Sequence, residues 1–154
     1  MGIQCLRNSM PGSAAIVLRI QGCEAMNGAQ LGKVGEISED VIHTLGLSLT
    51  PRTPIYIGRT NISHMLYRHP DAYVKYGSYI SEILNRPDYV GINPRDGSVE
   101  YVKEFRVDND FVKVAVRVAN SGRFFARSLY VLSPSRVNTF ITNGALKTLT
   151  KSGE

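Results

Sequence analysis

The chain has 154 residues, 43% of them hydrophobic, which is enough to bury one core of ordinary domain size without metals or disulfides. Its 18 Lys and Arg outnumber 13 Asp and Glu, and the charge of +5 favours an anionic partner. The 2 cysteines lack the spacing of a disulfide framework or a zinc site, so a reducing compartment is expected. No run is long and apolar enough for a membrane span or a signal peptide, which predicts a soluble cytoplasmic protein without membrane contact.

The first part of the chain is weakly patterned. Residues 1–30 hold several glycines and one strand-like run, residues 14–20, which predicts either an edge strand or an appended arm. The regular patterns begin after this region. Residues 31–150 therefore form the predicted domain.

The domain begins with a short strand and a short helix. Residues 33–37 predict the strand. Ser38 is placed to cap a helix over residues 39–45, and Gly46 is placed to end that helix. Residues 55–57 predict the next strand, which brings the chain to its most informative motif.

Two histidines, His64 and His69, follow this strand beside several arginines. Imidazole exchanges protons readily near neutral pH, so the pair is a candidate acid and base for phosphate chemistry. Five residues advance a helix by about 140° beyond a full turn, so the two rings share a face only if the helix ends first. Pro70 favours such an end, because it disfavours helical geometry at His69. We expect His64 in the loop after the strand; a capping or partly buried structural histidine is the alternative for either residue.

A second helix follows, and Asp71 is its expected N-cap. Apolar residues recur at helical spacing from there until Pro87. Three alternating runs come next, and connections of hairpin length join them into a predicted antiparallel meander. The runs are residues 98–105, 111–118 and 124–132. Ser135 and Arg136 then open a short C-terminal helix that ends at Gly144.

This order of elements predicts an α+β fold, with the N-terminal helices packed on one face of an antiparallel meander sheet and a short C-terminal helix. The other sheet face is then expected to be open. Strict alternation places Lys113 and Arg117 on the open face, gives Lys103 a shared face with two aromatic residues, and puts Arg127 and Ser128 on opposite faces. Basic and aromatic side chains together indicate an RNA surface, and an ordinary solvated face is the alternative.

Several segments together resemble one known family. They are residues 55–58, 64–70, 83–90, 102–103, 114–118 and 126–130. In combination they look like the phage-associated branch of the barnase, EndoU, colicin and RelE-like nucleases, called the BECR fold, over about residues 31–149. The resemblance implies a helix-then-meander fold and RNA cleavage without metal or cofactor, by attack of the ribose 2′-hydroxyl on its own phosphate. Such domains often serve as toxins or modules of mobile elements, so an antitoxin or immunity protein is a candidate partner besides RNA.

This cleavage needs a base, an acid, and cations or donors that stabilise the phosphorane. His64 and His69 are the candidate base and acid, in an order that the sequence leaves open. Arg127 or Arg117 is expected to hold the phosphorane, and Ser128 to donate a hydrogen bond. The residues expected to bind RNA are Arg59, Lys103, Lys113, Arg117 and Tyr130.

Other functions fit the pattern less well. A non-catalytic RNA-binding or protein-binding module on the same fold is the main alternative, with both histidines structural. A histidine-based metal enzyme is disfavoured, because no Asp, Glu or Cys lies at ligand spacing from either histidine. ADP-ribosyl transfer is also disfavoured, because the sequence does not contain the Arg, Ser-Thr-Ser and Glu-x-Glu motifs of such enzymes.

Overall fold

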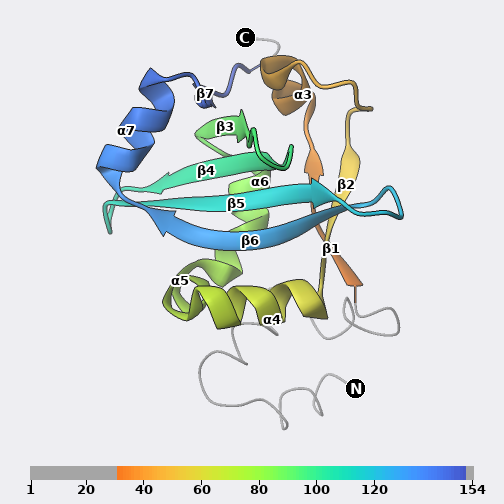
Figure 1. The fold of residues 1–154 in the computed structure, drawn as a ribbon, viewed down its shortest axis with the longest axis horizontal. Helices are drawn as coiled ribbons and strands as arrows, with labels where there is room; N and C mark the ends of the chain where they lie inside the picture. The colour runs from red at the N-terminus through yellow and green to blue at the C-terminus, as the bar shows by residue number, and fades with distance from the viewer. Residues whose placement is uncertain (1–30, 152–154) are drawn as a thin grey trace, which may run out of the picture.

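The computed structural model describes residues 31–151 (Figure 1). The strand-like run of residues 14–20 lies outside the described residues. The elements in chain order are β1 (Leu31–Ile37), α3 (Glu39–Leu45), β2 (Thr53–Gly58), α4 (Arg59–Arg68), α5 (Pro70–Tyr76), a 3₁₀ turn (Gly77–Tyr79), α6 (Ile80–Asn85), β3 (Tyr89–Ile92), β4 (Val99–Phe105), β5 (Asp110–Val118), β6 (Phe124–Leu132), α7 (Pro134–Thr142) and β7 (Leu146–Thr148).

Within the described part of the chain, the strands form one 7-stranded sheet in the order β1-β2-β6-β5-β4-β3-β7. The predicted meander is confirmed, since β4, β5 and β6 pair antiparallel in sequence order. Strand β2 joins this meander by a short parallel pairing with β6 at residues Ile55 and Tyr56. The fold is therefore α+β with a mostly antiparallel sheet, as predicted.

The strand and the helix that we predicted over residues 33–45 are also confirmed. The Ser38 side chain accepts a hydrogen bond from the backbone N–H of Val41, which begins α3. Gly46 ends the helix in the left-handed conformation, with φ of 65°, that glycine adopts without strain. A strand that the sequence did not predict, β7, pairs with β3, and it passes so close that a Cβ at Gly91 would clash with the carbonyl oxygen of Ala145.

The main core lies between one sheet face and the helices between β2 and β3. Alternate residues of β5 point into it, namely Val112, Val114 and Val116, and all three are fully buried. The helices contribute apolar and aromatic side chains to the same cluster, among them Met65, Tyr73, Tyr76, Ile80, Ile83 and Leu84. We call this side the helix-covered face.

The opposite face of the sheet is only partly open, which corrects the sequence-based expectation. Helix α7 lies across one end of it, as Figure 1 shows, and buries Val137 with Val102, Leu132 and Leu146 in a second apolar cluster. The sequence predicted α7 but not where it packs, because that depends on contacts between distant segments. The uncovered remainder of this face, which we call the pocket face, carries the candidate site.

The helical region between β2 and β3 also differs from the single helix that we expected. It contains α4, then α5, and then α6 after the Gly77–Tyr79 turn. His69 is the N-cap of α5 and Asp71 lies inside its first turn, so Asp71 is not the cap. Pro70 follows the end of α4, as expected. It is also the first residue of α5, where its missing N–H costs no hydrogen bond.

Candidate active site

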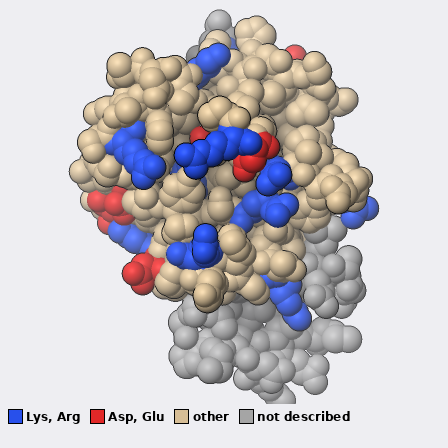
Figure 2. Space-filling model, in the orientation of Figure 1, with Lys and Arg blue, Asp and Glu red and all other residues tan. Residues whose placement is uncertain are grey.

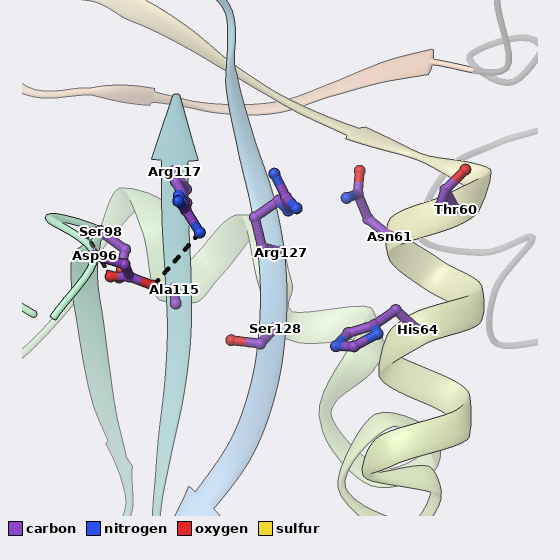
Figure 3. Close-up of a pocket in the computed structure, with 9 residues that line it drawn as sticks. All are labelled: Thr60, Asn61, His64, Asp96, Ser98, Ala115, Arg117, Arg127 and Ser128. Carbon is purple, nitrogen blue, oxygen red and sulfur yellow. Dashed lines mark hydrogen bonds and ion pairs between the residues drawn. The ribbon is translucent and has the colours of Figure 1, made fainter. Parts of the chain in front are cut away.

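A hollow of about 250 Å³ opens on the pocket face. Helix α4 forms one side, β5 and β6 form its floor, and the turn between β3 and β4 forms the other side (Figure 3). Its lining residues are Thr60, Asn61, His64, Asp96, Ser98, Ala115, Arg117, Arg127 and Ser128. Of the predicted site residues, the structure thus brings His64, Arg117, Arg127 and Ser128 together in one hollow.

Arg127 and Ser128 both line the hollow because β6 contains a bulge. Ser128 pairs with Ala115 and Ala126 pairs with Val116, so Arg127 has no partner on β5. An extra residue of this kind breaks the alternation of side chains and redirects its neighbours. The expectation that Arg127 and Ser128 lie on opposite faces is therefore wrong. Figure 3 shows the Arg127 guanidinium extending from β6 toward Asn61 of α4.

His64 lies in α4. The expectation that it lies in the loop after the strand is therefore wrong. The helix begins directly after β2, where the Asn61 side chain accepts a hydrogen bond from the backbone N–H of Gly58 at 2.9 Å. Ile62 and Met65 are buried on one side of α4, which leaves His64 exposed. Its imidazole points from α4 toward Ser128 on β6 (Figure 3).

Arg117 is held from the other side of the hollow by Asp96. The guanidinium lies 3.8 Å from one carboxylate oxygen of Asp96. The other oxygen accepts hydrogen bonds from the backbone N–H of Ser98 at 3.0 Å and from its hydroxyl at 2.7 Å. These bonds to Ser98, and then the charge of Arg117, lower the pKa of Asp96 below its ordinary value. Asp96 is thus a well-held anion facing the hollow.

Four polar lining residues were not predicted from the sequence, namely Thr60, Asn61, Asp96 and Ser98. An Asp-Gly pair at residues 96–97 signals a turn, and Gly97 indeed has a φ of 72°. That signal places a turn in the chain. It does not show that the turn lies beside Arg117, because the β4–β5 pairing decides this.

His69 does not line the hollow. It lies between α4 and α5, and its ring stacks on Tyr130 with 5.2 Å between the ring centroids and 29° between the ring planes. Lys113 also contacts this tyrosine, with its ammonium 4.8 Å from the ring centroid. His69, between α4 and α5, and Tyr130, on β6, thus form an aromatic pair beside the hollow.

The other predicted RNA contacts lie elsewhere. Lys113 is 4% exposed and forms a buried ion pair with Glu100 at 2.5 Å, so it does not stand on an open face. Lys103 lies on the helix-covered face, where its ammonium donates to the carbonyl oxygen of Arg86. Arg59 is exposed at the first position of α4 and does not line the hollow.

The surface around the hollow is basic. Figure 2 shows Lys and Arg side chains gathered around a depression on this side of the molecule, with fewer Asp and Glu among them. A basic surface of this kind attracts the phosphates of a nucleic acid. Within residues 31–151, no helix is long and apolar enough to cross a membrane.

The comparison with known families agrees with this geometry. The model of the phage-Barnase-EndoU-ColicinE5/D-RelE like nuclease 3 family matches residues 32–139, which is more than half of the chain. No curated protein and no solved structure matches the chain. The family is one of nucleases, and its substrates are nucleic acids. The chain therefore belongs to the phage-Barnase-EndoU-ColicinE5/D-RelE like nuclease 3 family.

Proposed function

We propose that this nuclease cleaves RNA in the hollow on the pocket face, without a metal ion. The ribose 2′-oxygen attacks the adjacent phosphorus, the bond from phosphorus to the 5′-oxygen breaks, and the products carry a 2′,3′-cyclic phosphate and a 5′-hydroxyl. The observation that supports this best is the convergence of His64, Arg117, Arg127 and Ser128 on one hollow.

The two arginines and Ser128 suit the binding of a phosphorane. A guanidinium presents paired N–H donors that match two phosphate oxygens, and the hydroxyl adds one more donor. Arg127 has no ion-pair partner among the interactions of the described residues, so its donors are free for a substrate oxygen. Together these groups supply positive charge where negative charge develops during the reaction.

The proton transfers require two groups on opposite sides of the phosphate, since attack and departure are in line. His64 lies on the α4 side of the hollow, and Asp96 lies across β5 and β6 from it (Figure 3). Within residues 31–151, Asp96 is the only carboxylate that lines the hollow, and its lowered pKa keeps it ionised, the form that can accept a proton. We propose that Asp96 removes the proton from the ribose 2′-hydroxyl and that His64 donates a proton to the departing 5′-oxygen. The sequence had paired His64 with His69, whose ring lies against Tyr130 instead.

A defined single-stranded RNA tests this proposal. Incubation with the protein in EDTA should yield fragments that end in a 2′,3′-cyclic phosphate. DNA of the same sequence should bind but remain intact, because it lacks the attacking hydroxyl. Cleavage of that DNA, or a requirement for added divalent metal, would contradict the mechanism. Binding of RNA without any product across a wide pH range would favour the non-catalytic binding module.

A further inference from the structure

His69 is held rigidly by the backbone on both of its sides. Its N–H donates to the carbonyl oxygen of Met65 at 2.9 Å, which ends α4, and its own carbonyl accepts from the N–H of Tyr73 at 3.0 Å, which begins α5. Pro70 follows it and disfavours helical geometry at His69, whose φ of −140° and ψ of 62° lie outside the helical region. The imidazole is nevertheless exposed to solvent. An exposed flat ring is thus attached to a well-held stretch of backbone.

The His69 ring packs against Tyr130, and Tyr130 in turn packs against a buried ion pair. The phenol ring of Tyr130 contacts the His69 imidazole and the Lys113 ammonium. Lys113 in turn is paired with Glu100, and both side chains are almost fully buried. A buried ion pair is costly to break, so the aromatic pair rests on a part of the structure that does not move readily.

The aromatic pair lies a short step along β6 from the proposed phosphate position. Tyr130 and Ser128 are two residues apart, and their partners Lys113 and Ala115 share one face of β5. Two residues of a strand span about 6.6 Å, which is comparable to the step from one nucleotide to the next in an extended strand. A nucleotide next to the one held at Ser128 would therefore bring its base toward Tyr130 and the His69 ring that stacks on it.

We propose that His69, supported by Tyr130, is a stacking subsite for one base of single-stranded RNA, next to the phosphate that is cut. This inference rests on the proposed function and extends it. Aromatic rings that are exposed and rigid bind the flat face of any base, so the subsite would tolerate all four bases. His69 then orients the substrate and takes no part in proton transfer.

Binding of trinucleotides tests the subsite without any cleavage. The ligands are a 2′-O-methyl RNA trinucleotide, which lacks the attacking hydroxyl, and three versions that each lack one base. The version that lacks the base stacked on His69 should bind the wild-type protein about tenfold more weakly than the complete trinucleotide does. This loss is within the usual range for one stacked base. In His69→Ala this difference should vanish, and in His69→Phe, which keeps a flat ring, it should remain.

Tyr67→Ala is the matched control. Tyr67 is an aromatic residue of α4 that is 83% exposed and makes no ring contact with Tyr130 within residues 31–151, so its loss should leave the tenfold difference intact. An equal difference in wild type and His69→Ala at every position would overturn the subsite.

Cleavage of ordinary RNA separates stacking from proton transfer. If His69 stacks, His69→Phe should cleave faster than His69→Ala in single-turnover reactions. Equal and complete loss in both variants would show that His69 transfers a proton and would overturn the inference. A base-dependent binding difference in a protein that leaves RNA intact would instead support the subsite and contradict the proposed chemistry.

Discussion

Arg127 and Ser128 both face the hollow because β6 carries one unpaired residue, Arg127, which interrupts the strand's alternation. If the Arg127 guanidinium holds the phosphorane, Arg127→Lys should reduce the single-turnover cleavage rate much more than RNA affinity, because lysine keeps the charge and loses the bidentate geometry. Cleavage and equilibrium binding of both Arg127→Lys and Arg127→Ala measure this. Near-normal cleavage by Arg127→Ala would remove this residue from the active site and leave Arg117 as the main phosphate contact.

His64 is exposed on α4, so its role is separable from the stability of the fold. His64→Ala should lower the cleavage rate by about 10²-fold or more, the usual effect of losing a general acid or base. The melting temperature should change little. Ser63→Ala is the matched control, since Ser63 is exposed on the same helix and does not line the hollow. Loss of folding with unchanged activity per folded molecule would mean that His64 is structural.

Asp96 links the chemistry of the hollow to pH. Since its pKa is lowered, first of all by hydrogen bonds from Ser98, cleavage should persist to a more acidic pH than an ordinary aspartate allows. Ser98→Ala removes the hydroxyl bond and keeps the backbone bond, so the acidic limb of the pH–rate profile should move toward higher pH. Asp96→Asn should abolish that limb along with most of the activity. An unchanged acidic limb in Ser98→Ala would contradict the role of Asp96.

At the scale of elements, α5 is tied to the beginning of β5. Asp110 accepts hydrogen bonds from the hydroxyl of Tyr76 at 2.5 Å and from the ammonium of Lys75 at 3.0 Å. These two bonds lower the pKa of Asp110, while burial and the same carboxylate raise the pKa of Tyr76 to about 12. This contact holds the helical layer against the sheet at the end opposite α3.

This contact predicts a pH-dependent stability. A carboxylate with a lowered folded-state pKa stabilises the fold above its ordinary pKa, and the contribution is lost as the pH falls through the lowered value. Asp110→Asn should therefore reduce the free energy of unfolding by about 1 kcal/mol near neutral pH. The difference from wild type should shrink toward zero in acid. Urea titrations at several pH values measure it.

The neighbouring turn offers the control for that measurement. Val107 is 99% exposed between β4 and β5, so Val107→Ala should leave stability unchanged at every pH. A deficit of Asp110→Asn that stays constant with pH would mean that packing, and not charge, connects α5 to the sheet.

At the scale of the whole molecule, the net charge of +5 affects RNA binding through the positions of the basic residues on the surface. Each phosphate contact contributes a slope of about −0.7 to the dependence of log affinity on log salt for a single strand. Arg117→Ala and Arg127→Ala should each reduce the slope by roughly that amount. Lys103→Ala should not, because Lys103 lies on the helix-covered face beside Glu82 and Arg86. A reduced slope in Lys103→Ala would mean that RNA also contacts that face.

The sequence by itself determined the local elements of this protein. Ser38 and Gly46 bound α3, Pro70 ends α4, and the alternating runs with short connections form the meander. These features depend on caps, on backbone restriction by proline and on side-chain period, which neighbouring residues set. The family could be identified from the same stretches, and four of the predicted site residues meet in one hollow.

Only the tertiary structure decided which side chains share a surface. The bulge at Arg127 reverses the alternation that a uniform strand would keep, and Asp96 joins Arg117 only because β4 and β5 pair in one register. Helix α7 closes part of a face that strand patterns leave open, and Lys113 is buried there with Glu100. Bulges, helix docking and the side chains that a sheet brings together depend on contacts between segments far apart in the chain, so the pattern of neighbouring residues does not determine them.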